Sequence, residues 1–240
     1  MLEIRNLYFS VEEDGIRKDI IKNLNVMVED GKFIVITGPN GSGKSTMARL
    51  IMGIEKPSSG QILLDGEDIT GLDITERAKK GVSFAFQQPV RFKGIRVKDL
   101  LRMASGKNLS ISAACDYLSE VGLCARDYID REINSSLSGG ELKRIEIATL
   151  LARHTRLSLF DEPEAGIDLW SFQNLIRIFE KMRNEIKDSS ILIISHQERI
   201  LNIADEILML SDGAIRERGT PAELMPKLVN AGNGVCQKLR

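Results

Sequence analysis

Cysteine is scarce in this chain of 240 residues, and the few cysteines form no recognisable pattern. Cys115, Cys124 and Cys236 are an odd number without Cys-x-x-Cys spacing, which argues against a disulfide framework and against a zinc site built from neighbouring residues. We therefore expect reduced thiols and a cytoplasmic location. A cluster or metal held by one of these cysteines is an alternative, but soft thiolate sites normally need more ligands than this spacing offers.

Excess charge and long apolar runs are lacking as well. The 33 Lys and Arg residues balance 34 Asp and Glu residues, which leaves a formal net charge of -1. Bulk electrostatics therefore does not favour nucleic acid or an anionic membrane surface as a partner. No apolar run approaches the roughly 18–20 residues of a membrane helix, and the acidic, alternating N-terminus does not resemble a signal peptide. We expect no nucleic-acid partner and no direct membrane insertion, so any membrane association would come through a partner protein.

Composition and periodicity predict an α/β protein. Apolar residues make up 42% and charged residues 28% of the chain, as in a folded globular domain. Strands are predicted for residues 2–11, 23–28, 32–37, 61–64, 158–160 and 190–195, with a polar turn at 12–19 and a hairpin at 206–218. Helices are predicted for residues 45–52, 97–103, 111–121, 142–153, 171–186 and 198–204, with a helical tail after 221. Because strands alternate with helices, we expect a parallel sheet, with residues 89–133 as a helical insertion.

A glycine-rich loop between a buried strand and a helix carries the strongest motif. It fits the pattern G-x-x-x-x-G-K-[ST], in which glycines let the backbone curl around phosphate oxygens while N–H groups face the anion. Lys44 is expected to reach the β- and γ-phosphates, and the Ser45 hydroxyl to bind Mg²⁺. Its position after a strand disfavours an ordinary glycine turn. The predicted nucleotide-binding residues are Gly38, Pro39, Asn40, Gly41, Ser42, Gly43, Lys44, Ser45 and Thr46.

Two adjacent carboxylates, Asp161 and Glu162, follow a short apolar run that only Ser158 interrupts. An Asp-Glu-Pro turn on its own is more often a solvated strand end. Together with a phosphate-binding loop it favours a hydrolytic site, in which Asp161 holds Mg²⁺ and Glu162 acts as the base that orients water.

A second anion site is predicted where the sequence Leu137-Ser-Gly-Gly-Glu141 precedes a helical stretch. Free N–H groups and the positive end of the helix dipole face outward together at such a turn. A plain helix cap is the alternative. Because one chain does not need two anion sites, we expect this turn to complete the nucleotide site of a second copy in a head-to-tail dimer.

These motifs, in this order, resemble those of the ATP-binding cassette (ABC) ATPases over nearly the whole chain. GPNGSGKST at residues 38–46 resembles the family's Walker A motif, LSGGE at 137–141 its signature motif, and LSLFDEP at 157–163 its Walker B motif. Gln87 matches the Q-loop glutamine, Asp168 the D-loop, and His196 the switch histidine. A lone histidine after a strand is usually structural, so His196 takes a functional role only from this alignment, and His154 takes none.

The resemblance implies an α/β P-loop NTPase of the ABC ATPase fold, with a RecA-like parallel-sheet core, an N-terminal antiparallel β subdomain and a helical signature subdomain. Residues 1–240 would form a single domain, with the core at 1–88 and 155–240 and the helical subdomain at 89–154. The implied catalytic residues of this Mg²⁺-dependent ATPase are Glu162, His196, Gln87 and Lys44, and the implied Mg²⁺ ligands are Ser45, Gln87 and Asp161. The implied signature residues, acting in trans on ATP, are Leu137, Ser138, Gly139, Gly140 and Glu141.

The resemblance also implies an ATP-dependent head-to-tail homodimer or pseudo-dimer whose interface the Asp168 loop crosses. Where many family members stack an aromatic ring on adenine, the alignment places Val11, with Tyr8 and Phe9 nearby. What contacts the base therefore stays open.

Three segments resemble the SufC-type ATPases of iron–sulfur cluster assembly, namely residues 84–95, 140–147 and 162–168. This resemblance implies a SufB/SufD-type scaffold protein as the partner. The segment 213–224 instead resembles importer cassettes, so the alternative is the nucleotide-binding subunit of an ABC membrane transporter, docked near Gln87 and residues 89–98. A non-catalytic nucleotide sensor is disfavoured because Lys44, Asp161, Glu162 and His196 are intact.

Overall fold

An antiparallel sheet forms the N-terminal end of the chain in this computed structural model, which describes residues 1–13, 15–106, 109–185 and 188–234. Its strands, in the spatial order β2-β1-β4-β5, are β1 (Leu2–Glu13), β2 (Ile16–Val28), β4 (Ser59–Leu64) and β5 (Glu67–Asp68). The pairing of β1 with β2 extends to Glu13 and Ile16. The prediction of a turn over residues 12–19 is therefore wrong, because an antiparallel ladder uses backbone groups and accepts polar side chains.

A second, larger sheet carries the predicted parallel strands. Its spatial order is β10-β9-β3-β8-β7-β6, and only β10 runs antiparallel to its neighbour. The strands are β3 (Phe33–Thr37), β6 (Val82–Ala85), β7 (Leu157–Asp161), β8 (Ser190–Ile194), β9 (Glu206–Ser211) and β10 (Ala214–Gly219). The sequence prediction lacks β6, whose four residues are too few for a periodic pattern. The predicted α/β class, with a parallel core sheet and an N-terminal antiparallel sheet, is confirmed.

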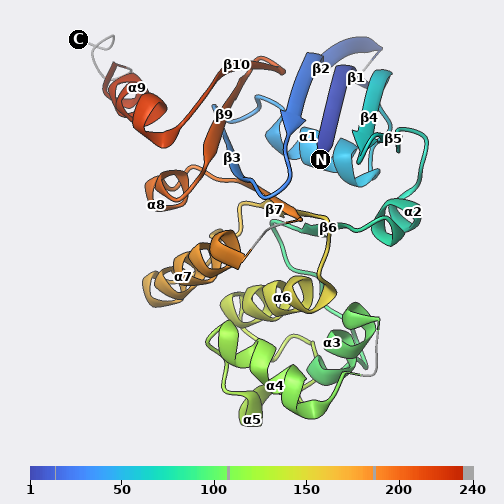
Figure 1. Cartoon of the computed structure of the whole chain (residues 1–240), viewed down its shortest axis with the longest axis vertical. Helices are drawn as coiled ribbons and strands as arrows, with labels where there is room; N and C mark the ends of the chain where they lie inside the picture. The colour runs from blue at the N-terminus through green and yellow to red at the C-terminus, as the bar shows by residue number, and fades with distance from the viewer. Residues whose placement is uncertain (14, 107–108, 186–187, 235–240) are drawn as a thin grey trace.

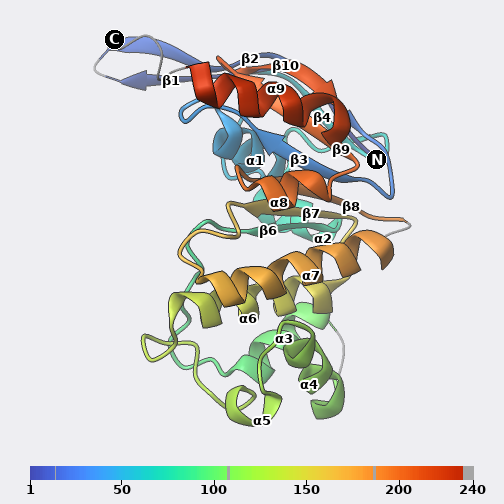
Figure 2. The same cartoon turned by 90° about the vertical axis from the view of Figure 1, so that its left-hand side faces the viewer.

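The helices are spread along the length of the molecule (Figures 1 and 2). They are α1 (Lys44–Met52), α2 (Ile74–Lys79), α3 (Val97–Ser105), α4 (Ile111–Glu120), α5 (Ala125–Tyr128), α6 (Gly139–Arg153), α7 (Leu169–Glu185), α8 (Glu198–Asn202) and α9 (Pro221–Gly234). Figures 1 and 2 both show α3 to α6 gathered at the end opposite β1, β2 and β4. Within the described ranges, no helix has both the length and the apolar character that crossing a lipid bilayer requires.

Each of the predicted helices with stated bounds differs from the structure by at most a few residues at one end, and the starts of α6 and α7 are two examples. α6 begins at Gly139 rather than at residue 142, because Ser138 and Glu141 form a capping box that satisfies the first backbone N–H groups. α7 begins at Leu169, and the predicted end of this helix at residue 186 lies outside the described residues.

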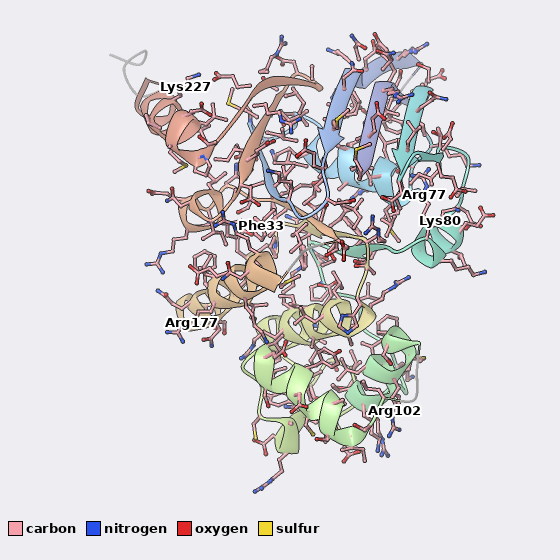
Figure 3. The ribbon with its side chains drawn as sticks, in the orientation of Figure 1. Phe33, Arg77, Lys80, Arg102, Arg177 and Lys227 are labelled. Atoms are coloured by element: carbon pink, nitrogen blue, oxygen red, sulfur yellow. The ribbon has the colours of Figure 1, made fainter. Side chains whose placement is uncertain are left out.

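The strand β3 lies at the centre of the parallel sheet, and its side chains alternate between two apolar clusters. Phe33 and Val35 join the cluster that contains the buried side chains of α6 and α7, whereas Ile34 and Ile36 join the cluster of α1 and the antiparallel sheet. Figure 3 places Phe33 between the two ends of the molecule, and its ring centroid lies 6.0 Å from that of Phe179 in α7. The sheet is thus covered on both faces, which explains why its strands are continuously apolar.

Arg77 of α2 anchors the end of α1. Its guanidinium is fully buried and donates to the carbonyls of Leu50 and Ile51 at 2.6 and 2.8 Å. It also donates to the carbonyls of Leu72 and Thr70 at 3.0 and 2.8 Å. Figure 3 places Arg77 beside α1, at the edge of the antiparallel sheet. Since the last carbonyls of a helix have no partner within it, Arg77 supplies donors that α1 would otherwise lack.

Candidate nucleotide site

The carboxyl ends of four neighbouring parallel strands bring the predicted site residues together. The glycine-rich loop follows β3, and His196 lies two residues after β8. Asp161 ends β7, and Gln87 lies two residues after β6. In α/β sheets, ligands bind at this edge, because the loops after adjacent parallel strands open on the same side.

The backbone of the glycine-rich loop needs glycine at two positions in particular. Gly38 has φ 141°, and a Cβ there would lie 1.9 Å from the Leu210 carbonyl oxygen. Gly43 has φ 100° and caps α1 without a side-chain hydrogen bond, and a Cβ there would lie 2.9 Å from Ile21 Cδ1. The first N–H groups of α1 therefore have no side-chain cap and face the loop, as in a phosphate-binding site.

The Lys44 side chain forms hydrogen bonds with backbone carbonyl groups of this loop. Its Nζ donates to the carbonyls of Gly38 and Pro39 at 2.8 and 2.9 Å. Burial lowers the pKa of Lys44, while the nearby Glu162 and Asp161 carboxylates raise it. Because its hydrogen-bond acceptors carry no formal charge, the ammonium can neutralise an incoming phosphate.

Asp161 and Glu162 face the start of α1 and the loop after β6. The Ser45 hydroxyl donates to Asp161 Oδ1 at 3.1 Å, and burial raises the pKa of Asp161. Gln87 Nε2 donates to Glu162 Oε2 at 2.5 Å. Glu162 has φ 44°, a left-handed conformation that non-glycine residues adopt rarely and that often marks functional sites.

His196 lies on the other side of the glycine-rich loop. Its Nδ1 is 3.5 Å from Thr37 Oγ1, at the end of β3. Loss of solvation and the neighbouring Lys44 ammonium lower the pKa of His196. The imidazole is therefore neutral at physiological pH and can both donate and accept a hydrogen bond.

Glu164 ties the His196 loop to the segment after β7, and no functional role was predicted for it. The Ser195 hydroxyl donates to Glu164 Oε1 at 2.5 Å, and the Gln197 N–H donates to Ser195 Oγ at 3.0 Å. Burial raises the pKa of Glu164. The only sequence signal for Glu164 is its place between Glu162 and the Asp168 loop.

A cavity of about 510 Å³ lies beside these groups. Its lining residues are Lys18, Ile20, Asn40, Gly41, Gly43, Lys44, Ser45, Thr46, Gln87 and Glu162. Lys18 and Ile20 come from β2. The sequence does not predict that they line the cavity, because only the strand register places them here. Val11 pairs with Lys18 across the hairpin, whereas Phe9 is buried in the core, and neither Val11 nor Phe9 lines the cavity.

The donor set around Asp161 fits Mg²⁺. Hydroxyl, carboxylate and amide oxygens from Ser45, Asp161 and Gln87 are the hard ligands that this ion prefers. Asp161 is 4% exposed, and burial raises its pKa. The neighbouring protein groups therefore do not fully offset the cost of burying its negative charge. The described residues contain no group of three or more His, Cys, Asp and Glu side chains that could hold a metal ion by itself, so phosphate oxygens and water would complete the coordination. Ser42 Oγ is also buried and has no hydrogen-bond partner among the described residues, which fits a neighbouring anion.

The predicted signature segment is not part of this cavity. Leu137 is buried, and Ser138 and Glu141 form the capping box of α6, with the Tyr128 hydroxyl also donating to Glu141. A Cβ on Gly139 or Gly140 would meet nothing within 4 Å. Figures 1 and 2 show α1 and α6 on opposite sides of the parallel sheet, and neither glycine lines the cavity beside the glycine-rich loop of its own chain.

Asp168 and His154 have structural partners. Asp168 accepts from the Ser171 N–H at 3.0 Å and the Ser171 hydroxyl at 2.7 Å, as a helix-capping residue does. The second histidine, His154, ends α6 and its Nε2 is 2.9 Å from the Tyr117 hydroxyl. Cys115 and Cys124 are free thiols, and Cys236 lies outside the described residues.

The parallel sheet, the glycine-rich loop and the paired carboxylates define a P-loop nucleoside triphosphatase. The family described as ABC transporter matches residues 21–165. The uncharacterized ABC transporter ATP-binding protein MJ0035 of Methanocaldococcus jannaschii is 38% identical over 215 residues, which cover 86% of this chain and 85% of that protein. The spermidine/putrescine import ATP-binding protein PotA of Mesoplasma florum is 31% identical over 229 residues, which cover 93% of this chain and 63% of that protein.

The fold also matches a solved ABC cassette. The dimeric ATP-binding cassette MJ0796, bound to ADP and Pi, has a TM-score of 0.82 and 23% identity, covering 92% of this chain and 99% of that one. The chain belongs to the ABC family and is an ATP-binding cassette of the ABC transporter type.

Proposed function

We propose that this chain is the ATP-hydrolysing subunit of an ABC membrane transporter and works at the cytoplasmic face of the membrane with Mg²⁺. The observation that carries the proposal is an apolar groove of about 190 Å³ between the end of β6 and helices α3 and α6. Phe86, Val90 and Phe92 line it and are 40%, 47% and 37% exposed. Apolar side chains gathered in this way favour a protein partner, and they lie beside Gln87, where the transporter hypothesis expects docking.

The residues that line the cavity, together with Asp161 and His196, are suited to hydrolysis. Lys44 and the loop N–H groups bind the β- and γ-phosphates, and Ser45, Gln87 and Asp161 hold Mg²⁺, which supplies charge stabilisation on the phosphate oxygens. Glu162 accepts a hydrogen bond from water and orients it toward the γ-phosphate. His196, neutral and 3.5 Å from Thr37 Oγ1, donates a hydrogen bond to the transferring phosphoryl group.

The signature segment acts on the ATP of a second copy in a head-to-tail dimer. The open space around Gly139 and Gly140 supports this, because neither residue has a left-handed φ and the fold of one chain would accept a side chain at either position. Neither backbone conformation nor crowding within one chain requires glycine here. Two glycines at the start of a helix are instead suited to close approach of another chain with its nucleotide. Ser138 and Gly140 then contact the γ-phosphate in trans, and Asp168 lies at the dimer interface.

Recovery of the partner tests the proposal. A tagged copy is purified from native extract with and without detergent, alongside the variants Val90→Glu in the groove and Ile111→Glu, an exposed apolar residue at the start of α4. We expect a polytopic membrane protein to accompany the wild type and Ile111→Glu only in detergent. Val90→Glu should lose it, because a charge would be buried at the contact. Equal recovery with Val90→Glu would contradict docking in this groove.

A second candidate function is the SufC-type role with a SufB/SufD-type scaffold. It rests on the sequence resemblance of residues 84–95, 140–147 and 162–168 to those ATPases. Stoichiometric soluble scaffold proteins that accompany the tagged chain without detergent would support this function over the transporter.

A further inference from the structure

Lys143 and Glu146 lie one turn apart on α6 and together bind both polar backbone groups of Phe86. The Phe86 N–H donates to Glu146 Oε1 at 3.1 Å, and Lys143 Nζ donates to the Phe86 carbonyl. The two side chains also form an ion pair with 3.2 Å between Nζ and Oε2. Phe86 is the residue directly before Gln87.

Stability alone does not account for this arrangement. The Lys143 side chain is 1% exposed and that of Glu146 is 15% exposed. Burying two charges costs solvation energy, and apolar side chains of similar size often stabilise a protein as well or better. Burial raises the pKa of Glu146, and its Oε2 lacks a well-aligned hydrogen bond among the described residues despite the nearby ammonium. What the pair does achieve is a fixed geometry for the two peptide groups on either side of the Phe86 Cα atom.

The backbone at Phe86 connects α6 to the proposed hydrolytic carboxylate, Glu162. Immediately after Phe86, Gln87 Nε2 donates to Glu162 Oε2 at 2.5 Å. At its N-terminus α6 carries Ser138, Gly139 and Gly140. The backbone before Gln87 is therefore fastened to the same helix that presents the signature residues to a second copy.

We propose that Lys143 and Glu146 are positioning residues for Gln87: by clamping the Phe86 backbone to α6 they set the place of the Gln87 amide relative to Glu162. A displacement of α6 then moves Gln87. Phe86 and Glu146 also line the apolar groove, so a partner seated there acts on the same clamp. The inference rests on the role of Gln87 in the proposed function, but it does not depend on which partner occupies the groove.

The clamp is tested with the purified chain and no partner. Variants of Lys143 and Glu146 are compared in the wild-type background and in a Gln87→Ala background. Lys143→Met and Glu146→Gln should each lower kcat by about tenfold while the KM for ATP changes less than about twofold, because a misplaced group impairs the reacting geometry more than substrate binding. Lys143→Arg, which keeps a cation and donors, should restore most of the loss. In a Gln87→Ala background, neither Lys143→Met nor Glu146→Gln should reduce kcat further.

The matched control is Lys181→Met, which removes a lysine from an ion pair with Glu120 at 3.0 Å between α7 and α4. It should leave kcat unchanged.

The clamp is overturned if Lys143→Met causes the same fold loss with and without Gln87, if Gln87→Ala has no effect by itself, or if kcat and KM change in parallel. Should Lys143→Met fail to fold, Glu146→Gln, which preserves side-chain shape, gives the same comparison. These outcomes are independent of partner recovery, so failure of the clamp and failure of the transporter role are distinguished.

Discussion

Asp161 shows, at the level of one residue, that a group placed for ligand binding can lower the stability of the free protein. The carboxylate lies at the end of a strand whose every residue is buried, and the Ser45 hydroxyl donates to it at 3.1 Å. The adjacent Glu162 carboxylate adds to the effect of burial in raising the pKa of Asp161. A negative charge is thus retained at a place where it is costly until a cation and phosphates arrive.

Asp161→Asn should therefore stabilise the free protein. A carboxyl pKa raised above its unfolded value of 3.8 makes folding most favourable below that value, and the stability falls as pH rises through the raised pKa. Asparagine does not ionise, and it keeps an acceptor for the Ser45 hydroxyl. We expect a gain of about 1 kcal/mol in the free energy of unfolding at pH 7 without nucleotide or metal.

Urea unfolding in EDTA at pH 7 and again near pH 4.5 measures this difference. The gain should shrink at the lower pH, where the wild-type carboxyl is more often protonated. A variant that is less stable than the wild type at both pH values would show that burial of Asp161 carries no such cost.

At the scale of elements, α1 depends on α2. α1 carries Lys44 and Ser45 in its first turn, and at its other end Arg77 donates to the Leu50 and Ile51 carbonyls. The helix that positions the phosphate-binding groups is therefore fixed by a buried guanidinium from a neighbouring element.

Arg77→Met should lower the free energy of unfolding by about 2–4 kcal/mol, because it leaves buried carbonyls without donors and a poorly filled space. Lys80→Met is the control, since the Lys80–Glu67 ion pair at 2.6 Å is partly exposed and worth about 1 kcal/mol at most. Chemical denaturation of both variants measures the difference. Equal losses would contradict the anchoring role of Arg77.

The order of strands and helices explains which site residues can be predicted from the sequence. Asp161, Glu162 and His196 are predictable because the ordered motifs place them after strands, and adjacent parallel strands bring such positions together. Ser158, which breaks the apolar pattern of β7, is accommodated by hydrogen bonds with Thr155 and Ser83. The boundaries of the predicted helical subdomain, 89 and 154, and the roles of the individual site residues stay predictions.

Other features could not be predicted, for physical reasons. Lys18 and Ile20 reach the cavity through the register of a hairpin whose polar residues indicate a turn. Arg77 lies in a polar stretch whose pattern gives no sign of burial. The contact of Lys143 and Glu146 with Phe86 joins residues about 60 positions apart, and only the packing of α6 against the end of β6 creates it.

At the scale of the whole molecule, the parallel sheet separates two apolar clusters, one with α1 and the antiparallel sheet and one with α6 and α7. The nucleotide cavity lies at the edge of that sheet, while the signature residues lie at the start of α6. Under the proposed function a complete ATP site needs two copies, and the proposed clamp between α6 and Phe86 links the dimer contact to the Glu162 carboxylate.

The most direct test of this account is the Glu162→Gln variant, measured for ATP turnover under saturating Mg²⁺-ATP and for mass in solution. We expect turnover to fall by about 10²–10⁴-fold, as for loss of a general base, while ATP binding persists. The variant should then form an ATP-dependent dimer that the wild type forms only transiently. Unchanged turnover, or a variant that stays monomeric with ATP bound, would contradict the assignment of Glu162 and the shared site.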